Sequence, residues 1–168
     1  GYYHAQTIRW LEEFGTVTGL GNLFIGYAHN NSWFILESLF SQPWLIGSPL
    51  HVMNGLMFII MFYVCLSGAD EITRKELSFS SLLKLTVLPF CVLYISQDIA
   101  SLSPDLPASI IIIITLIYIV ELLERETIGK LDVFILLILS LYAITIKLNT
   151  LPIIFTIFYI LFNKKMWK

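Results

Sequence analysis

The stretch ASIIIIITLIYIVELL, residues 108–123, decides the fold class, because it is almost purely apolar and holds five successive isoleucines, Ile110–Ile114. Its one charged residue is Glu121, close to its end. A helix needs about 20 such residues to cross the hydrocarbon core of a membrane, within a range of roughly 17–25. The stretch therefore predicts a membrane-spanning helix.

Four further apolar runs lie on either side of this stretch, at residues 50–67, 82–97, 133–146 and 153–162. The first two are close to spanning length, and the last two are short when taken alone. The last two form either two short helices that meet at residues 147–152 or one long helix broken by Pro152. The pattern of charges favours two helices.

The composition excludes the main soluble classes. Hydrophobic residues make up 57% of the 168 residues and charged residues 13%, whereas soluble domains have about 45–50% and about 25%. The mean hydropathy of +0.81 is too high for a soluble globule of this size and for a disordered chain. Two cysteines do not make a disulfide framework. We therefore expect an all-α, polytopic transmembrane bundle of about five spans.

The distribution of the ten basic residues predicts the orientation. If residues 1–46 lie outside and the chain crosses five times, eight basic residues lie inside and only Arg9 and Lys147 lie outside. Four crossings would give five on each side. Because inner loops are enriched in Lys and Arg, the sequence favours five crossings with the C-terminus inside. The outer side carries more acids than bases, which argues against nucleic acid as a partner.

Residues 1–46 are expected to form an outer, extracytoplasmic loop with short amphipathic helices, and residues 47–168 to form the transmembrane bundle. A first helix over residues 1–14 ends at Gly15 and places one set of side chains on one side: Tyr3, Thr7, Trp10, Leu11 and Phe14. A second helix, over residues 33–40, follows a group of N-cap residues, Asn30, Asn31 and Ser32. Since no cleavable signal precedes the outer loop, an upstream helix of the same polypeptide is an expected partner.

Two outer acids, Asp98 and Asp105, flank the second outer loop and are the candidate catalytic residues. Pro104 and Pro107 make a rigid turn that would hold Asp105 at the mouth of the bundle. A carboxylate there could act as a general base or hold a divalent metal through oxygen. The metal is possible and not required. The alternative is that Asp105 only stabilises the start of the third helix.

The candidate substrate-binding residues are the outer cations, imidazoles and amides: Arg9, Lys147, His4, His29, Asn30 and Asn31. Lys147 and Arg9 could hold a phosphate, although an outer lysine can instead extend toward the membrane surface. The imidazoles and amides could contact a sugar or an acceptor. The spacing of His4 and His29 does not match a metal-binding pair. The nearby tryptophans also suit a membrane interface.

Several segments together resemble a large family of bacterial multi-pass membrane proteins of unknown function, which itself looks like the GT-C glycosyltransferases. The matching segments are YHAQTIRWLEE (3–13), GLGNL (19–23), NSWF (31–34), SPD (103–105) and IKL (146–148). The resemblance spans most of the chain, and it implies that the chain is part of a longer protein.

The resemblance implies an enzyme in the bacterial cytoplasmic (inner) membrane that uses a polyprenyl-phosphate-linked sugar on the outer face. GT-C enzymes carry a catalytic acid in the first outer loop, often a second acid in a later loop, and a basic residue for the lipid phosphate. The chain begins just after the place where the first acid is expected. Asp105 and Lys147 match the later acid and the basic residue by context. Membrane lipid and the lipid-linked sugar are the implied partners.

Two other functions stay open from the residues themselves. A transporter or flippase of a lipid-linked or anionic substrate would carry polar residues in the middle of its spans. This sequence instead collects its charges in the loops. A non-enzymatic membrane assembly subunit is the third possibility.

Overall fold

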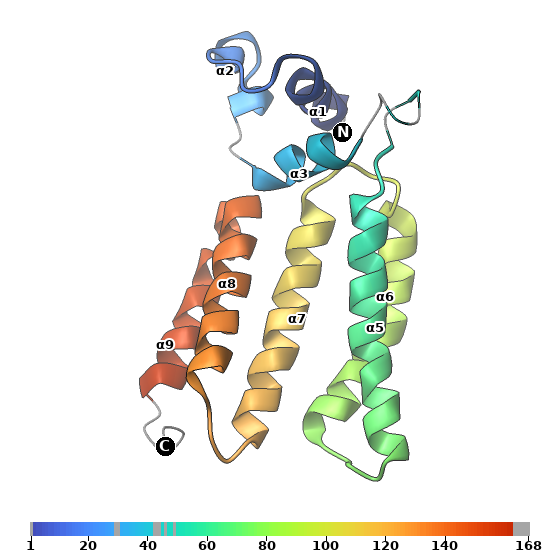
Figure 1. Cartoon of the computed structure of the whole chain (residues 1–168), viewed down its shortest axis with the longest axis vertical. Helices are drawn as coiled ribbons and strands as arrows, with labels where there is room; N and C mark the ends of the chain where they lie inside the picture. Colours follow the sequence, from blue (N-terminus) through green and yellow to red (C-terminus); the bar gives the residue numbers. More distant parts are fainter. Residues whose placement is uncertain (1, 29–30, 42–44, 46, 49, 163–168) are drawn as a thin grey trace.

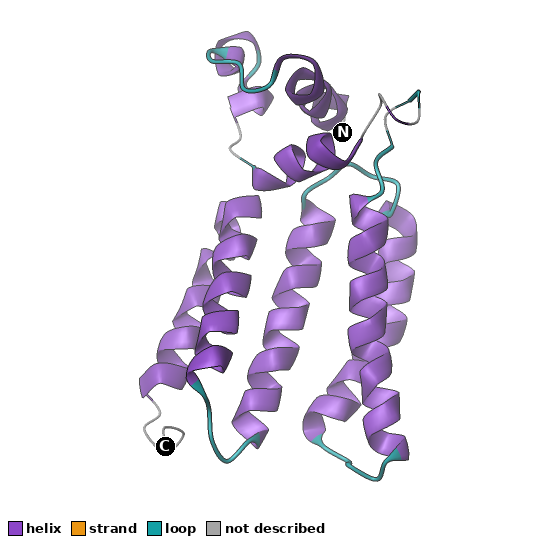
Figure 2. Ribbon diagram, in the orientation of Figure 1, coloured by secondary structure: helices purple, strands orange, loops and turns teal. Residues whose placement is uncertain are grey.

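The computed structural model describes residues 2–28, 31–41, 45, 47–48 and 50–162, and every regular element among them is a helix (Figure 2). In chain order these are α1 (Tyr2–Phe14), α2 (Leu20–Leu23), the 3₁₀ helix η1 (Ile25–Ala28), α3 (Ser32–Ser41), α5 (Met53–Thr73), α6 (Phe79–Asp98), α7 (Asp105–Glu124), α8 (Lys130–Ile146), the 3₁₀ helix η2 (Leu148–Ile153) and α9 (Ile154–Phe162). The expected all-α class is confirmed.

The helices form two layers (Figure 1). Helices α5 to α9 lie lengthwise and run in alternating directions, whereas α1, α2 and α3 lie together beyond one end of this bundle. We call α1 to α3, with η1, the end layer. The loop between α6 and α7 and the start of η2 lie at the end of the bundle that faces this layer. The fold therefore brings the expected outer loops to one end of the molecule.

Each apolar run of the sequence becomes a helix of the bundle. Two of these, α5 and α7, are long and apolar enough to cross a membrane, judged by length and composition. Shorter apolar segments occupy residues 79–94 and 148–160. The break between the last two runs is a real turn, because α8 ends at Ile146 and α9 begins at Ile154. The prediction of two helices in this region is confirmed.

Buried side chains tie the end layer to the bundle. Trp33 of α3 is fully buried and belongs to the same apolar cluster as Met57 of α5, Leu106 of α7 and Ala143 of α8. A second cluster joins α7, α8 and α9 nearer the other end and includes Leu122. Because α3 contributes to the first cluster, it rests directly on the bundle. The boundary expected at residue 46 falls among positions outside the described residues.

Local signals at the ends of α1 and α3 are as the sequence predicts. Gly15 takes the positive φ of +67° that follows a helix end, and Asn31 Oδ1 accepts a hydrogen bond from the Trp33 backbone N–H at 2.9 Å. Of the side chains that the sequence places on one side of α1, Phe14 is 61% exposed, whereas Ile8, which is not among them, is fully buried. The reason is that α1 packs against α3, which selects the side holding Ile8.

Candidate functional site

An ion pair joins α7 to the end of α8 where both meet the end layer. Lys147 Nζ donates to Asp105 Oδ1. The side chains are 40% and 56% exposed, respectively, so both groups remain accessible to a ligand. The two residues that the sequence places in separate outer loops are therefore in direct contact.

Local backbone structure fixes both partners. Asp105 is the first residue of α7, directly after Pro104, and its N–H donates to Ser103 Oγ at 3.3 Å. Lys147 has extended φ and ψ angles of −149° and 116°, and its N–H donates to the carbonyl of Ala143 at 3.0 Å. An acid in the first turn of a helix also stabilises the helix dipole. The position of Asp105 is thus compatible with a structural role as well as a chemical one.

A hollow of about 400 Å³ surrounds the pair. We call it the Asp105–Lys147 hollow. Its other wall comes from the end layer and includes Tyr3, His4, Asn31 and Phe34. His4 is 93% buried, since only 7% of it is exposed, and its ring centre lies 5.4 Å from that of Phe34. This volume falls within the range of about 300–1,000 Å³ that is usual for small-molecule sites.

The structure thus brings together four of the expected site residues: His4, Asn31, Asp105 and Lys147. Arg9 lies elsewhere, on the exposed side of α1, where its Nε donates to Glu13 Oε1 at 2.8 Å. His29 and Asn30 lie outside the described residues. Asp98 ends α6, and its side chain is outside the described part as well. Whether Asp98 joins Asp105 stays a prediction.

Within the described part of the chain, no group of three or more His, Cys, Asp or Glu side chains is arranged to hold a metal ion. Around Asp105, the charged partner is the ammonium of Lys147. An ammonium paired with a carboxylate can bind an anion through the lysine and can transfer a proton to or from the carboxylate.

The sequence did not reveal a buried acid in the end layer. Glu37 of α3 is only 1% exposed, and its Oε2 lies 3.8 Å from Nδ1 of His51, just before α5. Burial raises the pKa of Glu37 to about 7, and the indole of Trp33 opposes part of this rise. Trp33 and Glu37 are four residues apart and so share one side of α3. That spacing is the one signal in the sequence for this cluster.

Glu37→Gln is expected to stabilise the protein above pH 7 and to leave its stability unchanged below pH 4.5. Glu37 titrates near 7 when folded and near 4.5 when unfolded, so the wild type loses stability as the pH rises between these values. At about 1.4 kcal/mol per pKa unit, the gain for the variant is at most about 3–4 kcal/mol. Thermal unfolding of the full-length protein on both sides of this range measures it. A variant less stable than wild type above pH 7 would show that Glu37 is charged and paired with His51.

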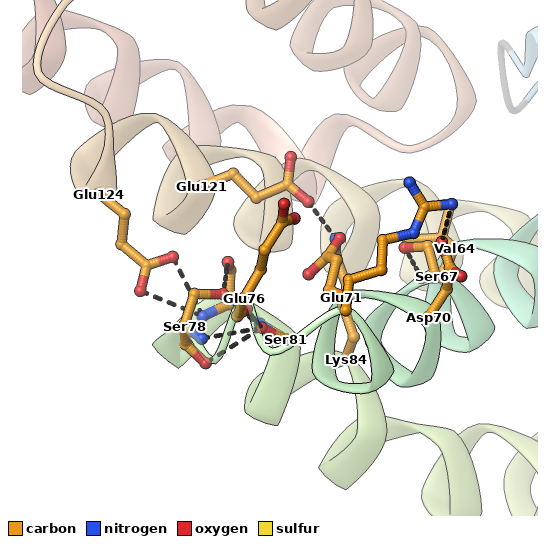
Figure 3. A network of polar contacts seen from close by, with 12 residues as sticks. Val64, Ser67, Asp70, Glu71, Glu76, Ser78, Ser81, Lys84, Glu121 and Glu124 are labelled. Atoms are coloured by element: carbon orange, nitrogen blue, oxygen red, sulfur yellow. Dashed lines mark hydrogen bonds and ion pairs between the residues drawn. The ribbon is translucent and has the colours of Figure 1, made fainter.

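A second polar cluster was also missed, at the other end of the bundle (Figure 3). Lys84 of α6 is 97% buried, with 3% exposed, and Nζ lies 2.5 Å from carboxylate oxygens of both Glu71 and Glu121. A Cβ on Gly68 would lie 2.8 Å from the Lys84 Cβ, so this glycine lets α5 and α6 approach closely. Glu124 Oε1 accepts from the Phe79 N–H at 2.6 Å. These contacts link α5, α6 and α7. The charged side chains of this cluster therefore have a structural role.

Comparison with known proteins places the chain in a family. Residues 1–168 match, over their whole length, the family described as "Domain of unknown function (DUF8201)". The chain belongs to the DUF8201 family. No match is found among curated proteins or among solved structures. Membership of DUF8201 assigns no activity, so the function has to be argued from the site itself.

Proposed function

We propose that this chain forms the outer-face active site of a bacterial inner-membrane glycosyltransferase that uses a polyprenyl-phosphate-linked sugar. The observation that supports this most is the accessible Asp105–Lys147 pair in a hollow of about 400 Å³ between the bundle and the end layer. A lysine suited to a phosphate and a carboxylate suited to an acceptor hydroxyl lie within one small-molecule-sized space.

The surface of the bundle supports a membrane location. Large apolar side chains are exposed on each of the helices α5 to α9, among them Tyr63, Phe90, Leu116, Phe134 and Phe155. Soluble monomers rarely expose apolar surface over such an extent. We propose five crossings with the end layer outside and the C-terminus inside. In this arrangement Arg74, Lys75, Arg125 and Lys130 lie at the inner end.

The reaction uses the two members of the ion pair separately. The lipid phosphate binds Lys147 Nζ and displaces the Asp105 carboxylate from it. The freed carboxylate takes the proton of the acceptor hydroxyl, and the acceptor oxygen forms a bond to the anomeric carbon. The bond from that carbon to the phosphate oxygen breaks, and its electron pair leaves with the polyprenyl phosphate. Lys147 stabilises the charge on the departing phosphate.

The neighbouring residues orient the substrates in this proposal. His4 and Asn31 face the pair from the end layer and offer hydrogen-bonding groups for the sugar. Arg9 has no part in phosphate binding, because it does not line this hollow and pairs with Glu13. A transporter would use polar groups deeper in the bundle, and the deeply buried Lys84 is already held by two carboxylates.

Lys147→Met is expected to weaken binding of polyprenyl phosphate by roughly 10- to 100-fold, because a hydrogen bond to a charged group contributes about 1.5–3 kcal/mol. The measurement is a titration of the full-length protein in detergent micelles with undecaprenyl phosphate. Lys130→Met is the matched control, since it removes an exposed lysine at the opposite end of α8. Equal affinity in wild type and Lys147→Met would refute the assignment of the phosphate to Lys147.

A further inference from the structure

We propose that the end layer holds a groove for a neutral oligosaccharide, which serves as the acceptor chain in the proposed reaction and therefore rests on that function. A hollow of about 500 Å³ lies between α1, the segment that follows it and α3. We call this the central hollow. The central hollow does not include the ion pair, but some of its lining residues also line the Asp105–Lys147 hollow.

The central hollow shares lining residues with two other hollows. It shares Ala28, Asn31 and Phe34 with the Asp105–Lys147 hollow. On its other side it shares Trp10 and Tyr27 with a hollow of about 340 Å³ along the outer side of α1. The central hollow therefore neighbours both of the others, which share no lining residue with each other, and the order of the three leads away from the Asp105–Lys147 pair. An acceptor whose end reaches Asp105 would extend along the three hollows in this order.

The lining of the central hollow matches an uncharged sugar chain. It contains no Asp, Glu, Lys, Arg or His among the described residues that line it. Instead it offers the aromatic rings of Trp10, Tyr27 and Phe34 and the amides of Asn22 and Asn31. The C–H faces of sugar rings stack on aromatic rings, and their hydroxyls exchange hydrogen bonds with amides. An anionic chain would find no cation among the described residues of the central hollow, and Arg9, which lines the next hollow along α1, is already paired with Glu13.

The same lining argues against a peptide. A peptide that binds by adding a β-strand needs the edge of a sheet, and the described residues contain no strand. A helical peptide needs a broad apolar groove, whereas the central hollow is lined by both aromatic and polar side chains. The oligosaccharide is the occupant that uses both kinds of group.

Local contacts hold the groove in shape. The Tyr27 hydroxyl donates to Gln6 Oε1 and so fastens η1 to α1. Gly21 lets its segment approach Ala28, because a Cβ on Gly21 would lie 3.0 Å from the Cβ of Ala28. These contacts bring the wall residues of α1, η1 and α3 together before any ligand binds. A preformed groove lowers the entropic cost of binding.

The test is calorimetric titration of the full-length protein in nanodiscs with linear neutral hexasaccharides of glucose, mannose, galactose or N-acetylglucosamine. We expect at least one to bind at least tenfold more tightly than its monosaccharide. Trp10→Ala should weaken that binding about tenfold, which corresponds to loss of roughly 1.4 kcal/mol. Asn22→Ala, at an exposed position that does not threaten folding, should weaken it about threefold to tenfold. Phe40→Ala, an exposed aromatic of α3 outside the groove, should leave it unchanged.

Three outcomes would overturn the groove: no hexasaccharide binds saturably, Asn22→Ala and a folded Trp10→Ala both bind as wild type, or a hexauronate binds as tightly as the neutral chains. Asp105→Asn separates this proposal from the proposed function. Hexasaccharide binding should persist in Asp105→Asn while transfer falls. A wild-type protein that binds the hexasaccharide but transfers no sugar to it would retain the groove and refute the enzyme. Transfer to an acceptor that does not depend on Asn22 or Trp10 would retain the enzyme and refute the groove.

Discussion

Asp105→Asn is expected to lower the rate of sugar transfer by about 10²- to 10⁴-fold, which is the usual contribution of a general base. The amide keeps nearly the same shape and cannot accept the proton of the acceptor hydroxyl. In the same variant, the affinity for polyprenyl phosphate should rise, because Lys147 no longer has the Asp105 carboxylate as a competing partner. The loss of rate and the gain in binding therefore go in opposite directions.

This combination distinguishes a catalytic carboxylate from a structural one. If Asp105 only stabilised the start of α7, its replacement would lower stability and would affect binding and transfer together. The measurements are the transfer rate and the undecaprenyl phosphate affinity of the same preparation. Asp70→Asn is the matched control, since Asp70 is exposed near the other end of the bundle and pairs with Arg74. A transfer rate in Asp105→Asn equal to that of wild type would contradict the proposed role.

Lys84→Met is expected to destabilise the fold by about 3 kcal/mol or more, because it leaves carboxylates uncompensated inside the bundle. Glu71 and Glu121 both contact Lys84 Nζ in the folded protein, and their side chains are only 29% and 25% exposed. Without the ammonium, these two like charges from α5 and α7 repel each other. The free energy of unfolding, measured by titration with SDS, should fall accordingly.

The triple variant Lys84→Met, Glu71→Gln, Glu121→Gln should recover most of this loss, since it removes all three charges together. Lys130→Met should have little effect, because Lys130 is exposed at the start of α8. If Lys84→Met were as stable as wild type, the cluster would not be a structural link. The buried charge of Lys84 would then favour a transporter function for the bundle.

The helices of the bundle were predictable because long apolar runs specify them almost regardless of context. Their ends were less so. The predicted run 50–67 becomes a helix that continues to Thr73, past the first charged residues. Asp70 and Arg74 pair across one turn at 2.8 Å, and Glu71 reaches Lys84 on the neighbouring helix. Interactions of this kind extend a helix beyond its apolar part.

The meeting of distant charges could be anticipated only where the chain offered few candidates. Asp105 and Lys147 were selected because they were rare charges at expected outer turns, and the fold brings them into contact. Lys84 was counted as one more inner cation, although it is buried between two glutamates. Whether a lysine near a helix end lies in solvent or in the bundle depends on the packing of α5 and α6. Sequence periodicity alone does not report that packing.

The most direct test of the central claim is the fate of the bond between sugar and phosphate. The full-length protein is reconstituted in liposomes and supplied with a polyprenyl-phosphate-linked sugar whose sugar is labelled. The neutral hexasaccharide that binds the protein most tightly is added as the acceptor. We predict that free polyprenyl phosphate appears in amounts equal to the labelled sugar transferred to the hexasaccharide. Movement of the intact lipid-linked sugar across the bilayer, with the bond uncleaved, would contradict the account.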